Sequence, residues 1–319
     1  MVATMVIGVD VGGSKIAAGL VGAAGQVHRR MSLPTPNRHG PVAIIGLIAD
    51  MCRDLSDGVA DPQLSVGVGS PGVVDSRRGI VTAATGTLPG WQGIDLAGHL
   101  AKATGMRVVV GNDANAFALG EHLHGAGRGT SDAMYVTVGT SVGGALVLQD
   151  RLLTGVHRRA GELGHFPIFE ADHGVCSCGR RGHLESSASG PAIAAAYARL
   201  AGDDTPRDLR EVAERARRGD AAAVTALTKG AEVLGRTLAG LAGVFDPRRV
   251  VVGGGVTQIG ARYWAPLRDA FHNGGLAVPP TVDILPAALG DDAGIVGAAA
   301  LTVHSLASTH HARGITPSR

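Results

Sequence analysis

A chain of 319 residues with a hydrophobic fraction of 45% can bury a large core, which excludes an intrinsically disordered protein and favours two lobes. The formal net charge of +2 comes without long basic runs, so the charge pattern argues against a nucleic-acid binder and favours small-molecule partners. Forty-nine glycines and only 3% aromatic residues indicate an α/β protein rich in small side chains.

No segment predicts export or a membrane span. The stretch from Met1 to Gly8 lacks the basic start and the small-residue cleavage site of a signal peptide. The longest apolar stretch, Ala133 to Leu148, is too short to cross a bilayer. Cys176 and Cys178 lie two apart, a spacing that favours metal binding in a reducing compartment. We therefore expect a cytoplasmic protein without membrane or nucleic-acid partners.

The first half of the chain is expected to form a meander of strands followed by alternating helices and buried strands. The predicted elements, in chain order, are strands at Val6–Val11, Ile16–Val21 and Gln26–Leu33, a helix at Pro41–Leu55, strands at Leu64–Val68 and Arg107–Val110, and a helix at Asp113–His124. Asn112 and Asp113 stand at the start of that last helix, where short polar side chains cap the first turn.

The second half repeats the strand–glycine–strand pattern of the start, which indicates a second lobe built like the first. The predicted elements are strands at Ala133–Val138 and Gly143–Leu148, helices at Ser189–Ala201, Leu209–Arg217 and Ala221–Phe245, a strand at Val250–Val252 and a closing helix at Asp292–Leu306. We expect a small lobe over 1–112, completed by the closing helix at about 292–308, a large lobe over 113–291, and a disordered tail over 309–319.

Three glycine loops stand at predicted strand ends. They are Asp10-Val11-Gly12-Gly13-Ser14-Lys15, Gly139-Thr140-Ser141-Val142-Gly143-Gly144 and Gly253-Gly254-Gly255. Glycine lets backbone N–H groups approach an anionic oxygen closely. One such loop is typical of an ordinary hairpin, but three at strand ends favour phosphate binding. None ends in the Gly-Lys-Ser/Thr of a P-loop, which excludes that class of nucleotide site.

A fourth glycine run, Gly67-Val68-Gly69-Ser70-Pro71-Gly72, matches the dinucleotide-binding fingerprint after a predicted strand. Pro71 falls inside the run, and no clearly capped helix follows it. We therefore interpret it as a loop on the substrate side that brings Gly72 to the substrate.

Taken together, these motifs resemble the ROK family (repressor, open reading frame, kinase), which belongs to the actin-like sugar kinases. The resemblance covers nearly the whole chain and rests on the order of the motifs DVGGSK, GVGSPGVVD, LPGW, NDAN, VGTSVGG, GELGH, VVGGG and LGDDAG. It implies an α/β, actin-like (ribonuclease H-like) fold of two lobes with an inserted zinc knuckle over 161–185.

The resemblance also implies how the glycine loops hold ATP. The residues that would face phosphate and its Mg²⁺ are Asp10, Gly12, Gly13, Ser14 and Lys15. In the second loop, Gly139 and Thr140 would clamp the remaining phosphates. The third loop, Gly253, Gly254 and Gly255, would border the adenosine. Ser141 departs from the pattern, because the family usually has glycine there.

Phosphoryl transfer needs a base that accepts the proton of the attacking hydroxyl. An aspartate that opens a helix is by itself normally a cap or a solvated charge. The match to NDAN implies that Asp113 is the base and that Asn112 binds a neighbouring sugar hydroxyl. By the same resemblance Glu162, His165 and Glu185 would complete the sugar pocket.

A candidate metal site is formed by the spacing H-x10-C-x-C-x4-H. Four nitrogen and sulfur ligands, His165, Cys176, Cys178 and His183, suit a closed tetrahedral structural Zn²⁺ site. The residues alone are equally consistent with a reduced C-x-C turn near unrelated histidines. The family pattern ends in cysteine where this chain has His183, so the implied site is a Cys2His2 variant with one thiolate fewer.

The implied function is ATP-dependent phosphorylation of the 6-hydroxyl of a hexose, with glucose as the default. An amino sugar such as N-acetylmannosamine or kanosamine, or a sugar-like cyclitol, remains an alternative, and so does polyphosphate as donor. The change at His183, close to Glu185, favours a specialised substrate. A homo-oligomer, dimer or tetramer, is expected.

Two non-catalytic alternatives are less favoured. Some members carry a DNA-binding helix-turn-helix before the kinase-like lobes, but here Asp10 already begins the first phosphate loop, so we expect no repressor module. The presence of Asp10, Asp113 and the glycine loops argues against a sugar-binding regulator without catalysis.

Overall fold

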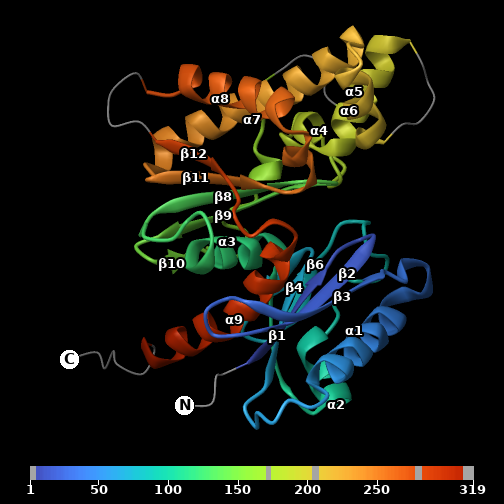
Figure 1. The fold of residues 1–319 in the computed structure, drawn as a ribbon, viewed down its shortest axis with the longest axis vertical. Coiled ribbons are helices and arrows are strands. Elements are labelled where there is room, and N and C mark those ends of the chain that lie inside the picture. The colour runs from blue at the N-terminus through green and yellow to red at the C-terminus, as the bar shows by residue number, and fades with distance from the viewer. Residues whose placement is uncertain (1–4, 170–173, 203–207, 277–281, 312–319) are drawn as a thin grey trace. The chain divides into compact units, whose positions relative to one another are not determined.

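The computed structural model describes residues 5–169, 174–202, 208–276 and 282–311, with side chains as far as Val303. The chain divides into two compact units. The first consists of Met1–Arg128, Val156–Arg159 and Asp291–Arg319, and the second of Gly129–Gly155 and Ala160–Gly290. Figure 1 shows their elements as a ribbon and labels most of the helices and strands.

The first unit is built on a five-stranded sheet with the order β3-β2-β1-β4-β7. Its elements are β1 (Val6–Val11), β2 (Lys15–Val21), β3 (Val27–Pro34), η1 (Asn37–His39), α1 (Gly40–Ser56), β4 (Ser65–Ser70), a hairpin of β5 (Val73–Asp75) and β6 (Ile80–Ala83), α2 (Leu96–Thr104), β7 (Arg107–Asn112), α3 (Asp113–His124), η4 (Gly290–Asp292) and α9 (Ala293–His311). β1 runs antiparallel to β2 and parallel to β4, and β4 runs parallel to β7.

The first sheet is covered by helices that approach it at different distances. Helices α1 and α2 bury branched and long side chains such as Ile48 and Leu100 against the strands. α9 contacts β1, β4 and α3 and lies closer to its strands. A Cβ placed on Gly67 of β4 would stand 1.9 Å from the carbonyl oxygen of Ala298 in α9. Only glycine fits at this crossing, which accounts for part of the glycine content of the strands.

The second unit is built on a sheet with the order β10-β9-β8-β11-β12. Its elements are β8 (Ala133–Val138), β9 (Val142–Leu148), β10 (Arg151–Leu152), η2 (Leu163–His165), α4 (Glu185–Ala188), α5 (Gly190–Ala201), α6 (Leu209–Arg217), α7 (Ala221–Phe245), β11 (Arg249–Gly253), η3 (Gly255–Ile259), α8 (Ala261–Gly274) and β12 (Asp283–Pro286). β8 pairs antiparallel with β9 and parallel with β11, which pairs parallel with β12.

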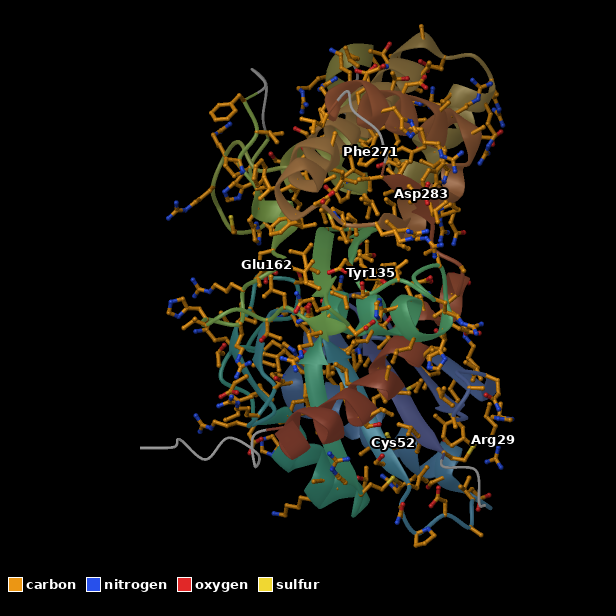
Figure 2. The ribbon with its side chains drawn as sticks, turned by 90° about the vertical axis from the view of Figure 1, so that its left-hand side faces the viewer. Arg29, Cys52, Tyr135, Glu162, Phe271 and Asp283 are labelled. Carbon is orange, nitrogen blue, oxygen red and sulfur yellow. The ribbon has the colours of Figure 1, made fainter. Side chains whose placement is uncertain are left out.

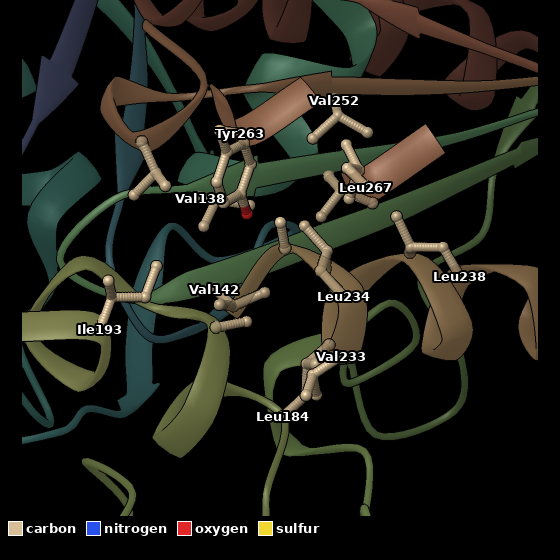
Figure 3. Close-up of a cluster of buried hydrophobic side chains, with 14 of the residues drawn as sticks. Val138, Val142, Leu184, Ile193, Val233, Leu234, Leu238, Val252, Tyr263 and Leu267 are labelled. Atoms are coloured by element: carbon tan, nitrogen blue, oxygen red, sulfur yellow. The ribbon is translucent and has the colours of Figure 1, made fainter. Parts of the chain in front are cut away.

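The core of the second unit joins this sheet to helices α5, α7 and α8. Figure 3 shows Val138 and Val142 of the sheet in one buried cluster with Leu184, Leu234 and other apolar side chains. Phe271 of α8, labelled in Figure 2, is also buried in this core. In the part of the chain that the structure describes, no helix is both long and apolar enough to span a bilayer.

The repeated strand pattern seen in the sequence is confirmed as a repeated sheet. In each sheet the first three strands in chain order form an antiparallel meander. The first of them lies at the centre of the sheet, and two further strands continue the sheet parallel to it on its other side. The α/β class and the long helices agree with the expectation. Elements that the sequence patterns did not predict are α2, α4, α8, the β5–β6 hairpin, β10, β12 and the 3-10 turns. α8 contains Pro266, and β12 is four residues long, so their patterns are weak.

Two expected boundaries differ from the structure. The small lobe was expected to end at residue 112, but the first unit continues through α3 to Arg128, because α3 packs on α9. The closing helix lies in the first unit, as the expected lobe requires. α9 continues to His311, so 309–311, expected in a disordered tail, are helical; the rest of that tail, 312–319, lies outside the described residues.

The glycine run Gly67–Gly72 is not a loop over most of its length. Strand β4 includes every residue from Ser65 to Ser70, each of them buried. Gly67 meets the backbone of α9 and leaves no space for a side chain. The interpretation as a substrate-side loop is therefore wrong for Gly67 to Ser70. Only Pro71 and Gly72, which come after the strand, are in a position to serve that role.

Candidate active site and metal centre

Polar residues gather at the carboxyl ends of the parallel strands of the first unit. Asp10 of β1 pairs with Gly69 of β4, and Ser70 of β4 pairs with Asn112 of β7. A Cβ on Gly69 would lie 3.5 Å from the Cα atom of Asp113. Ligand sites of open α/β sheets lie at this edge, because loops and helix starts converge there.

Asn112 and Asp113 are held by hydrogen bonds where β7 meets α3. Asn112 caps the helix, because its Oδ1 accepts from the N–H of Asn115 at 3.0 Å. Its Nδ2 donates to the carbonyl of Gly72 at 3.1 Å and to Asp113 Oδ1 at 3.0 Å. Asp113 Oδ1 also accepts from the N–H of Ala114. The arrangement fixes the Asp113 carboxylate and brings Gly72 beside it.

The first glycine loop is a tight turn between β1 and β2. The carbonyl groups of Gly12, Gly13 and Ser14 accept hydrogen bonds from Thr35 and Asn37, which come after β3. No partner for the backbone N–H groups of Gly13 and Ser14 is found among the described residues. A turn whose carbonyls are bound and whose N–H groups remain available suits an anionic ligand.

Asp10 lies at the start of this turn. Burial raises the pKa of its carboxyl group above the ordinary value, and the positive charge of Lys15 opposes that shift. The carboxylate also touches the start of α9, because a Cβ on Gly294 would lie 2.4 Å from Asp10 Oδ2. A helix start favours a negative charge. The partly buried carboxylate is therefore held between the turn and the start of α9, which suits a residue that meets a cation or phosphate-bound water.

Trp91 of the LPGW motif stabilises the end of β4 at this edge of the sheet. Its indole Nε1–H donates to Ser70 Oγ at 2.9 Å, and both side chains are fully buried. Ser70 stands beside Asn112 in the sheet register. The rarity of aromatic residues in this chain was a signal that could have singled out Trp91. Only the fold shows that it bonds to the end of β4.

The other two glycine loops lie together in the second unit. Gly253 ends β11 beside Thr137 of β8, and Gly254 comes next with φ of +93°. A Cβ on Gly254 would lie 2.4 Å from the carbonyl oxygen of Val138, the residue before Gly139. Since β8 and β11 are parallel, their ends meet at one edge as in the first unit. Gly139, Thr140 and Gly253–Gly255 are therefore brought together.

The GELGH segment packs on β9 with no side chain between the backbones. A Cβ on Gly161 would lie 2.6 Å from the carbonyl oxygen of Gly144, and one on Gly164 would lie 2.1 Å from that of Val142. Glu162, labelled in Figure 2, and His165 are thereby placed beside the start of β9, with 3.8 Å between Glu162 Oε2 and His165 Nε2.

His165, Cys176, Cys178 and His183 form one cluster, in which a ligand atom from each lies within 4.8 Å of the others. Nδ1 of His165 is 3.3 Å from Cys176 Sγ, and Nδ1 of His183 is 3.3 Å from Cys178 Sγ. These two edges of 3.3 Å match a tetrahedron with metal–ligand bonds of about 2.0–2.3 Å. The two nitrogens and two sulfurs, all from a short segment, therefore fit Zn²⁺.

The cluster is held by short backbone pairings. Pro167 pairs with His183 and Val175 with Arg181 as isolated bridges. Burial raises the pKa of the Cys176 thiol to about 12, with further raising from the nearby Glu185 carboxylate. Burial and the neighbouring His165 lower the pKa of His183. A bound Zn²⁺ would oppose the shift at Cys176, because a metal ion binds the thiolate form.

Glu185 comes after the cluster at the start of α4 and is only 5% exposed. Its Oε1 accepts from the N–H of Ser177 at 3.1 Å and from the Cys176 thiol at 3.2 Å, and its Oε2 accepts from the N–H of Val142 at 3.2 Å. Burial acts to raise the pKa of Glu185, but these hydrogen bonds hold it below the ordinary value. Both oxygens are thus engaged by the protein.

The ROK family profile matches residues 6–305 of the chain. The chain belongs to the ROK family. A glucokinase from Thermotoga maritima is 36% identical over 310 residues, which cover 92% of this chain and 96% of the relative. An N-acetylmannosamine kinase from Shigella boydii is 36% identical over 303 residues, covering 92% and 97% of the two chains.

A solved ROK glucokinase from Streptomyces griseus, in complex with glucose and AMPPNP, matches with a TM-score of 0.82. It is 35% identical and covers 93% of this chain and 98% of its own. The actin-like two-lobed fold expected from the ROK resemblance is thereby confirmed. The ROK motifs fall into two groups by unit: Asp10 to Lys15, Gly72, Asn112 and Asp113 lie in the first, and the remaining predicted residues lie in the second.

Proposed function

We propose that this ROK protein transfers the γ-phosphoryl group of ATP to the 6-hydroxyl of a hexose, with glucose as the first choice. The support comes from relatives named glucokinase that match over nearly their full length, and from the structural match to one solved with glucose and AMPPNP. The observation in this chain that carries the proposal is the Asp113 carboxylate, fixed beside Asn112 and Gly72 at the carboxyl edge of a parallel sheet.

In the proposed reaction Asp113 accepts the proton of the sugar hydroxyl as its oxygen bonds to the γ-phosphorus. The bond from phosphorus to the bridging oxygen of ADP breaks in the same transfer. Asn112 binds a neighbouring hydroxyl, and Glu162, His165 and Glu185 are the other side chains assigned to the sugar. Gly72 contributes through its backbone, which Asn112 already holds.

The nucleotide is assigned to the glycine loops. Gly12, Gly13 and Ser14 offer backbone N–H groups, Lys15 a positive charge, and Asp10 a carboxylate for phosphate-bound Mg²⁺, which neutralises developing charge when bound. Gly139 and Thr140 take the other phosphates, and Gly253, Gly254 and Gly255 border the adenosine. The paired positions of these loops in each sheet support this assignment.

The Cys2His2 cluster is proposed to hold a structural Zn²⁺ ion. His165, Cys176, Cys178 and His183 would provide all four ligands, a closed set that leaves no position for substrate. With Nδ1 of His165 bound to the metal ion, its Nε2 atom, which lies near Glu162, is left to face the sugar. Reduced thiols as ligands are consistent with a cytoplasmic location, and a homo-oligomer remains part of the proposal.

N-acetylmannosamine is the second candidate substrate, because a kinase named for it is as similar in sequence as the glucokinase. The test is a coupled ADP-release assay with ATP and a panel of glucose, mannose, N-acetylmannosamine, kanosamine and cyclitols, with polyphosphate as alternative donor. The proposal expects the highest kcat/KM for a hexose with ATP. An enzyme that turns over none of these sugars, or prefers an amino sugar, overturns the first choice.

A further inference from the structure

The Gly253–Gly255 turn, which the proposed function assigns to adenosine, contains two glycines that lack a side chain for different reasons. Gly254 has a φ of +93°, and a Cβ there would lie 2.4 Å from the carbonyl oxygen of Val138. The fold itself therefore requires glycine at that position. Gly255 is exposed, its φ is not positive, and a Cβ there would meet no described atom within 4 Å. The side of the turn at Gly255 is thus open to a ligand.

A turn with consecutive glycines needs support to keep one conformation, because glycine loses more conformational freedom on ordering than any other residue. The 3-10 helix η3 that follows is five residues long, and 3-10 helices have poorer hydrogen-bond geometry than α-helices. Within η3, the N–H and the hydroxyl group of Thr257 both donate to the carbonyl of Gly254, at 3.1 and 2.8 Å. Thr257 is therefore the residue through which η3 holds the glycines.

Trp264, in the first turn of α8, holds Thr257. Its indole Nε1–H donates to the carbonyl of Thr257 at 3.2 Å. The partly buried ring packs against the core of the unit, and the guanidinium carbon of Arg268 lies 5.1 Å from the ring centroid, where a cation is attracted to the aromatic face. Tyr263, the preceding residue, is fully buried in the cluster that also holds Val138 (Figure 3). The indole donor is therefore fixed to the core.

We propose that Trp264 is a positioning residue for the adenosine side of the nucleotide site, which keeps the Gly253–Gly255 turn ordered through Thr257. The proposal rests on the proposed function for the nucleotide role of these glycines. Trp264 acts on the fraction of the protein in which the turn is already ordered. The apparent affinity for a ligand falls in proportion to that fraction, so a weaker support should weaken nucleotide binding.

The test compares Trp264→Phe and Thr257→Val with the wild-type protein. The first removes the indole N–H but keeps an aromatic ring, and the second removes the hydroxyl group but keeps the branched shape. We expect the Kd for a non-hydrolysable ATP analogue, measured by calorimetry, to rise about fivefold in each variant, the size of one hydrogen bond. The KM for ATP should rise with it, while kcat and the Kd for glucose change by less than about twofold.

The double variant tests whether the two residues act in one chain of contacts. Because Trp264 acts through Thr257, the nucleotide Kd of Trp264→Phe/Thr257→Val should rise about tenfold, less than the roughly 25-fold product of the two single changes. A rise equal to the full product means that the residues act independently, and it overturns the proposed route from Trp264 to the glycines.

Two matched controls lie in the same unit. Tyr197→Phe also removes an aromatic donor with a bond of 3.2 Å, from its hydroxyl group to Asp220. Thr237→Val removes a hydroxyl group with a bond of 2.8 Å to the carbonyl of Val233 in α7. Both should leave the nucleotide Kd unchanged, and thermal unfolding is measured for every variant. An unchanged nucleotide Kd in Trp264→Phe, or an equal rise in the controls, overturns the proposal.

Hydrogen exchange separates a failure of this role from a failure of the proposed function. In the ligand-free protein, the amides of residues 254–260 should exchange about fivefold faster in Trp264→Phe than in the wild type, and at the wild-type rate in Tyr197→Phe. Unchanged exchange overturns the positioning role even if the wild-type protein is a sugar kinase. If the wild-type protein binds neither the ATP analogue nor glucose, the proposed function fails, and the nucleotide role of Trp264 fails with it.

Discussion

The two glycine turns, Asp10–Lys15 and Gly139–Val142, occupy the same place in two sheets of the same strand order, yet they are supported differently. Each connects the first strand of its sheet to an antiparallel neighbour. The first turn contains its own charges, Asp10 and Lys15, and is held through its carbonyls by the chain after β3. The second has no charged residue and is held by Glu185 and Gly190. The two sheets therefore share their strand order, but their equivalent turns are stabilised by different contacts.

The ends of the outer parallel strands differ as well. β7 ends at Asn112 and leads directly into α3 with Asp113, whereas β12, its counterpart in the second sheet, ends at Pro286. The end of β7 thus leads into the carboxylate proposed as base, whereas the metal-ligand loop of the second unit lies between β10 and α4 and not at β12. The two units therefore differ chemically in the segments attached to equivalent strands.

The largest expected effect tests whether the carboxylate of the first unit is the base. Asp113→Asn keeps the hydrogen-bond geometry at the start of α3 but cannot accept the proton, so kcat should fall about 1,000-fold. Steady-state kinetics and a thermal unfolding curve are the measurements. A variant that retains more than about a tenth of wild-type turnover removes Asp113 from this role.

The charge of the first turn is tested by Asp10→Asn. We expect a loss of about 100-fold in kcat/KM and a higher Mg²⁺ concentration for half-maximal rate, because the variant lacks the negative charge that attracts the cation. Stability should change in the opposite direction. Burial raises the pKa of Asp10 above its ordinary value of 3.8, so the folded protein loses stability as the pH rises through the raised pKa.

Asp10→Asn should therefore raise the melting temperature near neutral pH, and the difference should vanish below the ordinary pKa, where the carboxyl group is protonated in both states. Melting curves between pH 3 and about 8 measure it. Lower stability of the variant at neutral pH would contradict a buried, poorly solvated carboxylate.

The close approach of α9 to the first sheet is tested by Gly67→Ala. The new Cβ would stand 1.9 Å from the Ala298 carbonyl oxygen, and we expect a loss of about 2 kcal/mol in the free energy of unfolding. Gly46→Ala in α1 is the matched control, because a Cβ there meets nothing within 4 Å. It should stabilise the protein by about 0.5–1 kcal/mol. Equal effects at both glycines would contradict the close approach.

The last prediction concerns the metal-ligand loop, where the smallest effect is expected for His183→Cys. His183→Cys adds a thiolate to the cluster and should tighten Zn²⁺ binding by about tenfold, whereas Cys178→Ser should leave protein purified without added zinc nearly free of metal. Elemental analysis and competition with a chromogenic chelator measure both. Metal content that is unaffected by Cys178→Ser would place the ion elsewhere.

Much of this protein could be predicted from the sequence where a signal is local. Strand boundaries at Val6–Val11 and Ala133–Val138, the helix Asp113–His124 and its Asn112 cap agree with the structure. Hydrophobic periodicity and capping act within a few residues, so they can be read without the fold. The metal ligands were also named from spacing, and the structure brings all four together.

The sequence-based interpretation was wrong where a glycine can serve either a ligand-binding loop or a close contact between elements. Gly67 and Gly69 in β4 resembled a ligand-binding loop, but Gly67 is needed because α9, more than two hundred residues later, presses its backbone onto that strand. The same helix draws α3 into the first unit and moves the boundary from residue 112 to Arg128. No local pattern records a partner so distant in the chain.

The sequence by itself determined the family, the order of its motifs and the chemical groups that the site contains, because these depend on residue type and spacing. Only the tertiary structure decided which of those groups are already engaged. Glu185 is a carboxylate after the metal-ligand loop in the sequence; in the fold it is buried, and its two oxygens bind the N–H groups of Ser177 and Val142. Hydrogen bonds between residues 43 positions apart depend on packing, which only the folded chain provides.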